Sequence, residues 1–227
     1  MRVLNPYLER QRLLVVFATI LLNVVGVLVF TRVPGSDWKT GLALNLADNV
    51  LLFAHVFRTR DMLMLRLMLF GLVVGLVELM ADAWLVSVTG TLDYSVGGGP
   101  MIWCSPAWMP LAWMVVAVQF GYIGLRLFEA MGPAGLIING LIGAINIPFY
   151  EEMAFHIHWW SYRHCRMIFH TPYYIILGEF FIAAALGYLA TCVRERSMAR
   201  VFSSGVLGGL AIFVSYAAAH VVWDRIF

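Results

Sequence analysis

Charged residues are scarce in this sequence. Only 12% of its 227 residues are charged while 62% are hydrophobic, and the mean hydropathy is +0.84. Soluble domains average about 25% charged residues, so the composition excludes an ordinary soluble domain. A net charge of +2 without any basic run gives no indication of a nucleic-acid partner. The composition therefore predicts an integral multi-pass membrane protein whose main partner is the lipid bilayer.

Lysine is almost absent, and cysteine is rare. Lys39 is the only lysine and lies between two apolar runs, so no amine at membrane depth can bind a carbonyl chromophore as a Schiff base. The three cysteines, Cys104, Cys165 and Cys192, have no metal-binding or redox spacing. A DDxxD motif for Mg²⁺ is also lacking, which argues against ionisation of a diphosphate. From these patterns we expect no cofactor and no bound metal.

Long apolar runs dominate what is present. A transmembrane helix needs about 20 mostly apolar residues. Seven segments meet this requirement, with short connections and no internal repeat between them. They are residues 12–31, 41–57, 62–88, 108–128, 133–158, 173–193 and 201–223. We expect an all-α bundle of seven membrane-spanning helices that forms a single domain over residues 1–227.

Positive charges are distributed unevenly between the two predicted faces of this bundle. The side of the N-terminus carries Arg2, Arg10, Arg12, Arg58, Arg60, Arg126, Arg194, Arg196 and Arg200, and the other side carries Arg32, Lys39, Arg163, Arg166 and Arg225. Because positive residues concentrate on the cytoplasmic side, we predict a cytoplasmic N-terminus, in the inner or plasma membrane if the source is bacterial. The two longest connections, around 89–107 and 159–172, are then outside. Both are rich in aromatic residues and are expected to cover the outer mouth of the bundle.

Six of the thirteen acidic residues lie within the predicted spans. They are Asp48, Glu78, Asp82, Glu151, Glu152 and Glu179. A charged side chain at the bilayer centre costs at least about 2.5–3.5 kcal/mol. Each of these carboxyl groups must therefore be paired, protonated or placed in a polar cavity. Their number in so small a chain predicts a buried site that donates and accepts protons.

Glu78 and Asp82 are four residues apart and so share one helical face. Two carboxyl groups that close cannot both be ionised at low cost, so one would stay protonated and could act as a general acid. The alternative is that one of them pairs with Arg66 or with an asparagine of a neighbouring helix. We interpret the pair as the proton donor of the site.

The predicted fifth span ends in the densest group of polar residues. Pro148 is expected to kink or break the helix, and a break at membrane depth usually faces a cavity. Glu151 and Glu152 follow and point to different sides of the helix. One of them is expected to face the cavity, and the other a partner such as Arg163. His156 comes four residues after Glu152.

Two further acids and a set of aromatic residues complete the candidate site. Glu179 is surrounded by apolar residues and needs a partner across the bundle, while Asp48 lies beside two asparagines and could connect helices by hydrogen bonds. The aromatic residues could form an interfacial belt. They could also line a pocket, where a π face stabilises a cation by about 0.5–2 kcal/mol. The candidate substrate-binding residues are Trp84, Tyr94, Trp103, Trp108, Trp113, Tyr150, His156, Trp159 and Tyr173.

Three functions are compatible with these residues. An intramembrane metalloenzyme could use Glu152 with His156, or His220 with Asp224, because each pair is four residues apart. A proton-coupled transporter could use the carboxyl groups as a relay, although most secondary carriers contain inverted repeats. We favour an enzyme that protonates a long apolar substrate, because buried acids and aromatic faces provide a proton and stabilise the resulting cation.

A family resemblance points to the same chemistry. Its positions within residues 74–116 are Glu78, Thr89–Gly90, Tyr94, Gly99–Pro100, Pro106 and Pro110–Trp113, and later ones are Glu151–Glu152, Trp159–Trp160, Thr171–Pro172 and Leu177–Gly178. This pattern resembles the membrane carotenoid-hydratase family, of the bisanhydrobacterioruberin-hydratase and carotenoid 1,2-hydratase type. In size and number of spans the chain is also similar to membrane-integral terpene cyclases.

The resemblance implies acid-initiated cyclisation or hydration of a lipophilic, polyprenyl-type isoprenoid that enters from the lipid. In such a reaction we expect Asp82 or Glu78 to donate the proton. Glu151 or Glu152 would act as the base that ends the reaction or positions water. Glu179 and Asp48 would complete the polar floor of the cavity. The sequence does not define the oligomeric state.

Overall fold

The computed structural model describes residues 6–194 and 197–226, with side chains described as far as residue 223. Its helices are α1 (Pro6–Phe30), α2 (Trp38–Thr59), α3 (Met62–Trp84), α4 (Met109–Met131), α5 (Pro133–Ile157), α6 (Tyr173–Val193) and α7 (Met198–Ile226). All seven are long and apolar enough to cross a membrane. The prediction of an all-α, multi-pass membrane protein is therefore confirmed.

Two helices differ from their predicted form in ways that affect the site. Pro148 lies inside α5, which continues as one helix on both sides of it, so the helix does not break there. Beyond α3, residues Leu85–Thr89 form a π-helical turn, η1, which ends at Gly90 with a left-handed φ of 65°. Such turns occur frequently at functional sites, and this one begins three residues after Asp82.

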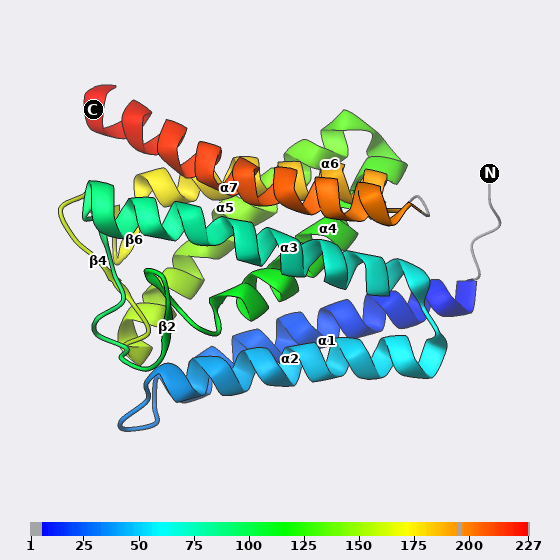
Figure 1. The fold of residues 1–227 in the computed structure, drawn as a ribbon, viewed down its shortest axis with the longest axis horizontal. Coiled ribbons are helices and arrows are strands. Elements are labelled where there is room, and N and C mark those ends of the chain that lie inside the picture. Colours follow the sequence, from blue (N-terminus) through cyan, green and yellow to red (C-terminus); the bar gives the residue numbers. More distant parts are fainter. Residues whose placement is uncertain (1–5, 195–196, 227) are drawn as a thin grey trace.

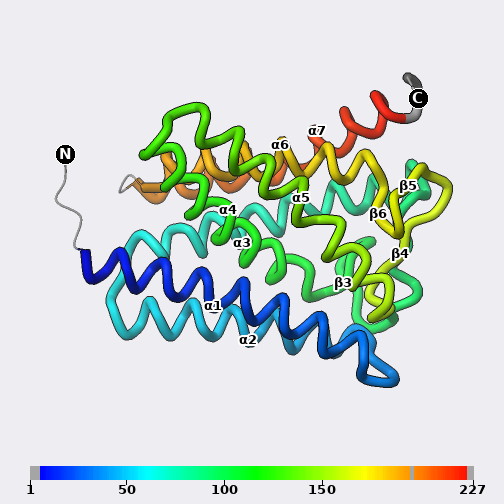
Figure 2. Tube along the Cα trace, turned by 180° about the vertical axis from the view of Figure 1, so that it is seen from behind, coloured from blue at the N-terminus to red at the C-terminus, as the bar shows by residue number. Residues whose placement is uncertain are grey.

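The helices α3, α4 and α6 occupy the middle of the bundle, while α1 and α2 run side by side along one edge (Figures 1 and 2). Glycines permit close contact between the central helices. A Cβ atom on Gly75 of α3 would lie 2.4 Å from the Pro110 carbonyl oxygen of α4. One on Gly143 of α5 would lie 2.7 Å from the Glu179 carbonyl oxygen of α6. Small residues at these crossings let the backbones approach closely, as is common in membrane bundles.

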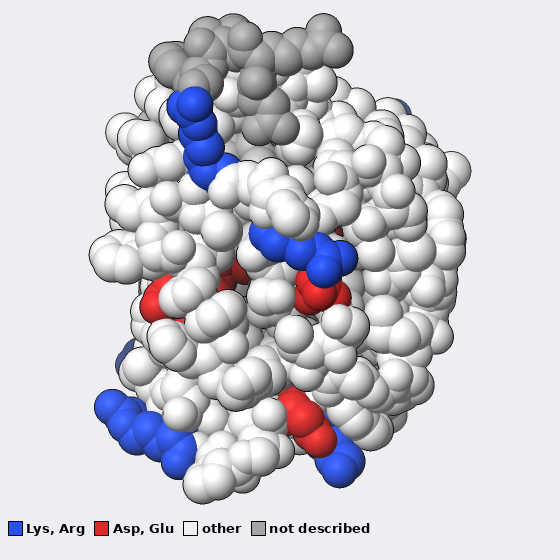
Figure 3. Space-filling model, turned by 90° about the vertical axis from the view of Figure 1, so that its left-hand side faces the viewer, with Lys and Arg blue, Asp and Glu red and all other residues white. Residues whose placement is uncertain are grey.

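Three connections lie at one end of the bundle, here called the loop end (residues 31–37, 90–108 and 158–172). Two of them are joined by a pair of short strands. The strand β1 (Leu92–Asp93) pairs with β4 (Ser161–Tyr162), which joins the second of these segments to the third. The pairs β2 (Met101–Ile102) with β3 (Ser105–Pro106) and β5 (Met167–Ile168) with β6 (Thr171–Pro172) form short hairpins. Figure 3 shows this end as mostly uncharged, with a few separated acidic and basic side chains.

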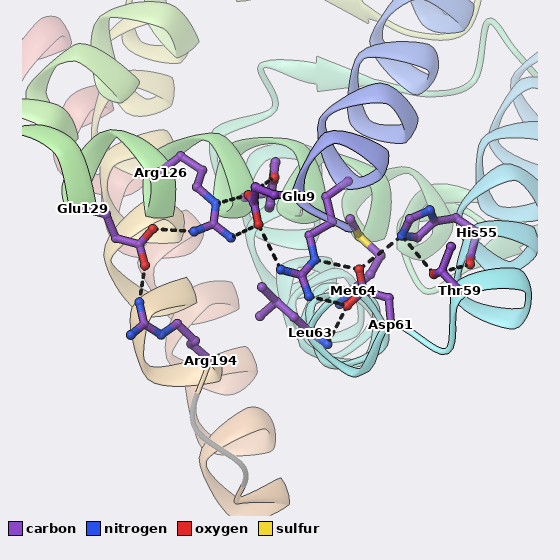
Figure 4. A network of polar contacts seen from close by, with 11 residues as sticks. Glu9, His55, Thr59, Asp61, Leu63, Met64, Arg126, Glu129 and Arg194 are labelled. Atoms are coloured by element: carbon purple, nitrogen blue, oxygen red, sulfur yellow. Dashed lines mark hydrogen bonds and ion pairs between the residues drawn. The ribbon is translucent and has the colours of Figure 1, made fainter. Parts of the chain in front are cut away.

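The opposite end holds a cluster of ion pairs, here called the charge network (Figure 4). Its members are Glu9, Arg12, His55, Asp61, Arg126, Glu129 and Arg194. Arg12 of α1 donates to both oxygens of Asp61, over 2.7 and 2.8 Å. Arg126 of α4 donates to Glu9 over 2.9 Å. The network therefore joins α1 to α4 and to the start of α3.

Asp61 is the most deeply buried acid of this network and also caps α3. Its Oδ1 accepts from the backbone N–H groups of Leu63 and Met64, over 3.0 and 3.3 Å. Burial raises the pKa of Asp61, but the hydrogen bonds from Arg12 and His55 outweigh it, so the net pKa is lowered. A carboxyl group with a lowered folded-state pKa contributes stability above its unfolded value of about 4 and loses it as pH falls through the folded value.

The detergent-solubilised protein is therefore expected to lose stability below about pH 5. Thermal unfolding midpoints of the wild type and of Asp61→Asn should converge as pH falls, because the protonated wild-type side chain then resembles the amide. A difference between the two midpoints that stayed constant from pH 7 to about pH 3 would contradict this assignment.

Candidate functional site

A cavity of about 170 Å³ lies between the helices beneath the loop end. Most of its lining is apolar or aromatic, from α1, α2, α4 and α5 and from the segments at the loop end. Three carboxyl groups reach it from three different helices: Asp82 on α3, Glu151 on α5 and Glu179 on α6. Three acids that are far apart in the sequence therefore meet at one cavity. This agrees with the expectation that buried acids need a polar cavity.

Asp82 and Glu78 form the deepest acidic pair. The Tyr94 hydroxyl donates to Asp82 Oδ2 over 2.7 Å. Glu78 lies one turn behind Asp82, is fully buried, and finds no hydrogen-bond partner for either carboxyl oxygen among the described residues. Asp82 and the Trp113 indole are close enough to interact with it electrostatically. A buried carboxylate without donors is costly, so this arrangement favours a shared proton on the pair.

Glu151 and Glu179 also accept hydrogen bonds from neutral groups. The Trp160 indole donates to Glu151 Oε2 over 2.5 Å, and the Tyr162 hydroxyl donates to Oε1 over 3.2 Å. The Tyr216 hydroxyl of α7 donates to Glu179 Oε1 over 2.5 Å. Each acid of the cavity is therefore held by a phenol or an indole.

The tyrosines at the loop end are fixed as donors by their surroundings. Burial and the charge of neighbouring acids raise the pKa of both Tyr94 and Tyr162 well above the ordinary value. Both phenols consequently keep their protons over the physiological range and orient the acids without competing for ionisation.

Basic groups are missing from this lining. Of the described residues that line the cavity, none is Lys, Arg or His. Arg163 is an arginine of the loop end, but it does not pair with an acid of the cavity. It forms an ion pair with Asp93 over 3.3 Å. A positive charge that forms inside the cavity would therefore meet carboxyl groups and π faces, with no cation to repel it.

Amide side chains form a second polar region of the cavity. Asn23, Asn45, Gln119 and Asn146 line it. Asp48 lies behind them, where its Oδ2 accepts from Asn23 over 2.7 Å and its buried Oδ1 has no partner in the described structure. Asp48 thus supports the lining without being part of it.

The predicted aromatic residues divide into two groups. Tyr94, Trp108, Trp113, Tyr150 and Trp159 line the cavity. The rings of Trp108 and Trp159 meet edge to face at a centroid distance of 5.6 Å, and the Trp159 indole donates to Thr40 of α2 over 3.0 Å.

Four of the nine predicted substrate-binding residues lie outside the cavity lining. Trp84 packs against Phe213 and His220 of α7, Tyr173 stacks on Trp223, and the Trp103 side chain is 68% exposed. His156 contacts Glu152.

Glu152 also lies outside that lining and faces away from its neighbour Glu151. It contacts His156 and His170 rather than the Arg163 expected as its partner.

Several cavity residues carry a signal that sequence reasoning did not use. Tyr216 lies in the middle of an apolar span, where a lone hydroxyl needs a partner as much as a lone acid does. Asn23 and Gln119 are similar polar residues within spans. The roles of Trp160 and Tyr162 depend on the pairing of β4 with β1, which no local pattern indicates.

Possible metal ligands are confined to one cluster within the described side chains. Glu152 and His156, four residues apart on α5, are joined by His170 from the loop end. The side chain of Asp224, which would pair with His220, lies outside the described part of the chain. The acids of the cavity belong to no such cluster.

Comparison with known proteins gives a family but no activity. No curated protein and no solved structure matches the chain. Residues 79–223 match a family described as a domain of unknown function, DUF6989. This match begins at the acidic face of α3 and extends to the last turns of α7, so it includes Asp82, Glu151 and Glu179. It covers well over half of the sequence, and the chain therefore belongs to the DUF6989 family.

Proposed function

We propose that the protein is a membrane-integral enzyme that protonates an apolar, isoprenoid-type substrate inside this cavity and directs the resulting carbocation to cyclisation or hydration. The substrate would enter from the lipid, since the helices that surround the cavity are apolar on their outer faces. The proposal concerns a lyase or isomerase type of reaction that uses no cofactor.

One contrast within the molecule carries the proposal. At the end of the charge network each acid is paired with arginine or histidine, which keeps a carboxylate ionised and structural. In the cavity Asp82, Glu151 and Glu179 accept hydrogen bonds from phenols and an indole, and none of the three forms an ion pair with a described Lys, Arg or His. Neutral donors in a water-poor site leave a carboxyl group free to hold or release a proton. The two ends therefore use the same residue types for different purposes.

The Asp82–Glu78 pair is our choice for the acid. Glu78 is fully buried and interacts with the Asp82 carboxyl group and the Trp113 indole, so one proton shared by the pair is available at the cavity wall through Asp82. Transfer of this proton to a substrate C=C bond forms one C–H bond. The electron pair of the O–H bond stays on the carboxylate, and the substrate becomes a carbocation.

Glu151 is our choice for the base. Both of its oxygens accept from neutral donors, which hold them in place at the cavity wall, and in the proposed reaction it starts as the carboxylate. It could take a proton from carbon, which closes a new C=C bond and gives an isomer of the substrate. It could equally take a proton from a water molecule that attacks the cation, which gives an alcohol. In both outcomes Asp82 gives up one proton and Glu151 receives one, so the number of protons on the protein does not change.

Cation stabilisation comes from the aromatic wall. Trp108, Trp113 and Tyr150 line the cavity together with the acids and the amides. Interactions between a cation and a desolvated ring are worth about 2 kcal/mol or more each. A few such rings can stabilise a travelling positive charge without forming a covalent bond to it.

The test is product analysis of cells that express the protein together with candidate polyprenyl precursors. Lipid extracts should contain a new compound with the mass of its precursor, which indicates cyclisation or isomerisation, or with the mass of one added water, which indicates hydration. Membranes that carry the Asp82→Asn, Glu151→Gln double variant are the control and should contain neither. If the precursors stay unchanged while reconstituted vesicles show proton-dependent uptake of a solute, the protein is a transporter and the proposal fails.

A further inference from the structure

Three metal-binding side chains meet on the surface of α5, outside the cavity. Glu152 and His156 come from the last two turns of α5, and His170 comes from the turn between β5 and β6. Glu152 Oε1 lies 3.0 Å from His156 Nε2, and Oε2 lies 2.8 Å from His170 Nδ1. The ligand atoms of all three residues lie within 4.8 Å of one another.

Contacts around His170 hold the cluster in place. The Phe155 ring stacks on the His170 imidazole at a centroid distance of 3.5 Å with an interplanar angle of 8°. The His170 backbone N–H also donates to Glu152 Oε2 over 3.2 Å. Both the ring and the backbone of His170 are thereby fixed against α5. The histidine is not a freely rotating surface side chain.

The cluster is accessible from solvent and contains no competing cation. The side chains of Glu152, His156 and His170 are 25%, 51% and 36% exposed. Within residues 6–194 and 197–223, no Lys or Arg forms an ion pair with Glu152. A cation can therefore reach the Glu152 carboxylate from water. It would neutralise this carboxylate as arginine does for the acids of the charge network.

From this geometry we infer a binding site for a divalent transition metal ion, with zinc as its best match. Two imidazole nitrogens and one carboxylate oxygen, with a fourth position open to water, are a known zinc ligand set. Zinc bonds of about 2.0–2.2 Å place tetrahedral ligand atoms about 3.3 Å apart. The two Glu–His distances, each to a different oxygen of Glu152, are slightly shorter than this. The distance between the two histidine nitrogens, which is at most 4.8 Å, would have to shorten. Small side-chain rotations at the surface would bring both into range.

The site joins two parts of the molecule that shape the cavity. Glu152 directly follows Glu151, which faces the cavity, and His170 belongs to the segment that also supplies Trp160 and Tyr162. A bound ion would fasten this segment to α5. It would stabilise the folded state, since the unfolded chain holds no such cluster. This inference does not depend on the proposed reaction, and its failure would leave the acid chemistry of the cavity untouched.

The site is tested with the full-length, tag-free protein in detergent. The protein is first dialysed against EDTA to remove bound metal and is then titrated with zinc. Calorimetry should show one zinc ion bound per chain. At zinc concentrations about 100-fold above Kd the thermal unfolding midpoint should rise by about 5–10 °C. His170→Ala and Glu152→Gln should each weaken binding by at least about 10-fold. The matched controls are His158→Ala and His164→Ala, because both residues are exposed histidines that are close to the cluster in sequence but outside it. They should leave Kd unchanged.

Chemical labelling supplies a second readout that needs no variant. In the wild-type protein, zinc should protect His156 and His170 from acylation by diethyl pyrocarbonate, mapped by mass spectrometry, while His158 and His164 stay reactive. The proposal is wrong if no saturable binding occurs below about 1 mM zinc. It is also wrong if zinc protects only His158 and His164, or if binding survives loss of Glu152 and His170.

Discussion

Product formation is expected to fall by about 10²- to 10⁴-fold when Asp82 is replaced by asparagine, the range for loss of a general acid. The amide has nearly the same volume as the carboxyl group and still accepts the hydrogen bond of Tyr94, which is 2.7 Å long in the wild type. The replacement therefore removes the proton and little else. Glu78→Gln should also lower product formation, because glutamine cannot share a proton with Asp82.

The matched control is Asp93→Asn. Asp93 lies next to Tyr94 in the sequence, but its carboxylate pairs with Arg163 and does not line the cavity. Its replacement should leave product formation within about twofold of the wild type, as expected for a surface carboxylate away from the chemistry. The rates should be compared at equal amounts of folded protein, judged by size-exclusion elution and thermal unfolding. Full activity of Asp82→Asn, Glu78→Gln and Glu151→Gln would show that the proposed mechanism is wrong.

The largest effect on stability is expected at the other end of the bundle. Asp61→Asn should reduce the free energy of unfolding by about 3–5 kcal/mol, because it breaks a buried ion pair made by two hydrogen bonds and leaves the Arg12 guanidinium with Glu9 as its remaining acidic partner. The Asp61 side chain is fully buried and that of Arg12 is 11% exposed, so water cannot replace the lost contact. Asparagine caps helices about as well as aspartate. The loss therefore reports on the ion pair and not on the cap of α3.

A double-mutant cycle separates the pair from its surroundings. The Arg12→Met, Asp61→Asn double variant should be less destabilised than the sum of the two single variants, since neither charge is then left alone. Lys39→Met is the control for an exposed pair, because Lys39 is 71% exposed beside Asp37, and it should cost less than about 1 kcal/mol. Denaturant unfolding in detergent measures the wild type and all four variants. Additive effects of Arg12 and Asp61 would mean that the pair does not act as a unit.

The spans could be predicted because bilayer thickness and hydropathy together define them. Their exact ends could not, since polar residues extend the helices where other helices provide partners. The helix α1 begins at Pro6, six residues before the predicted start of the span. This extra turn and a half is held by Glu9 and Arg12, which contact Arg126 and Asp61 from distant parts of the chain. Such partners are visible only once the helices are packed.

The acids of the site could be predicted from the energetic cost of burying them. Which of them faces the cavity and which the surface could not be predicted. Glu151 and Glu152 are equivalent in sequence, and only the rotation of α5 about its axis places one in the cavity and the other on the surface. Their partners come from the loop end: Trp160 and Tyr162 reach Glu151, and His170 reaches Glu152. These contacts depend on the pairing of β1 with β4 and on the β5–β6 hairpin, which join two-residue strands too short to leave a pattern.

The absence of Lys, Arg and His from the described cavity lining has a pharmacological consequence. A lipophilic tertiary amine is mostly protonated in water at neutral pH, and its ammonium form imitates the cation that the cavity is proposed to stabilise. Compounds that resemble a transition state bind far more tightly than substrates. Long-chain tertiary amines should therefore be inhibitors of this protein. Their potency should depend on Asp82 and Glu151.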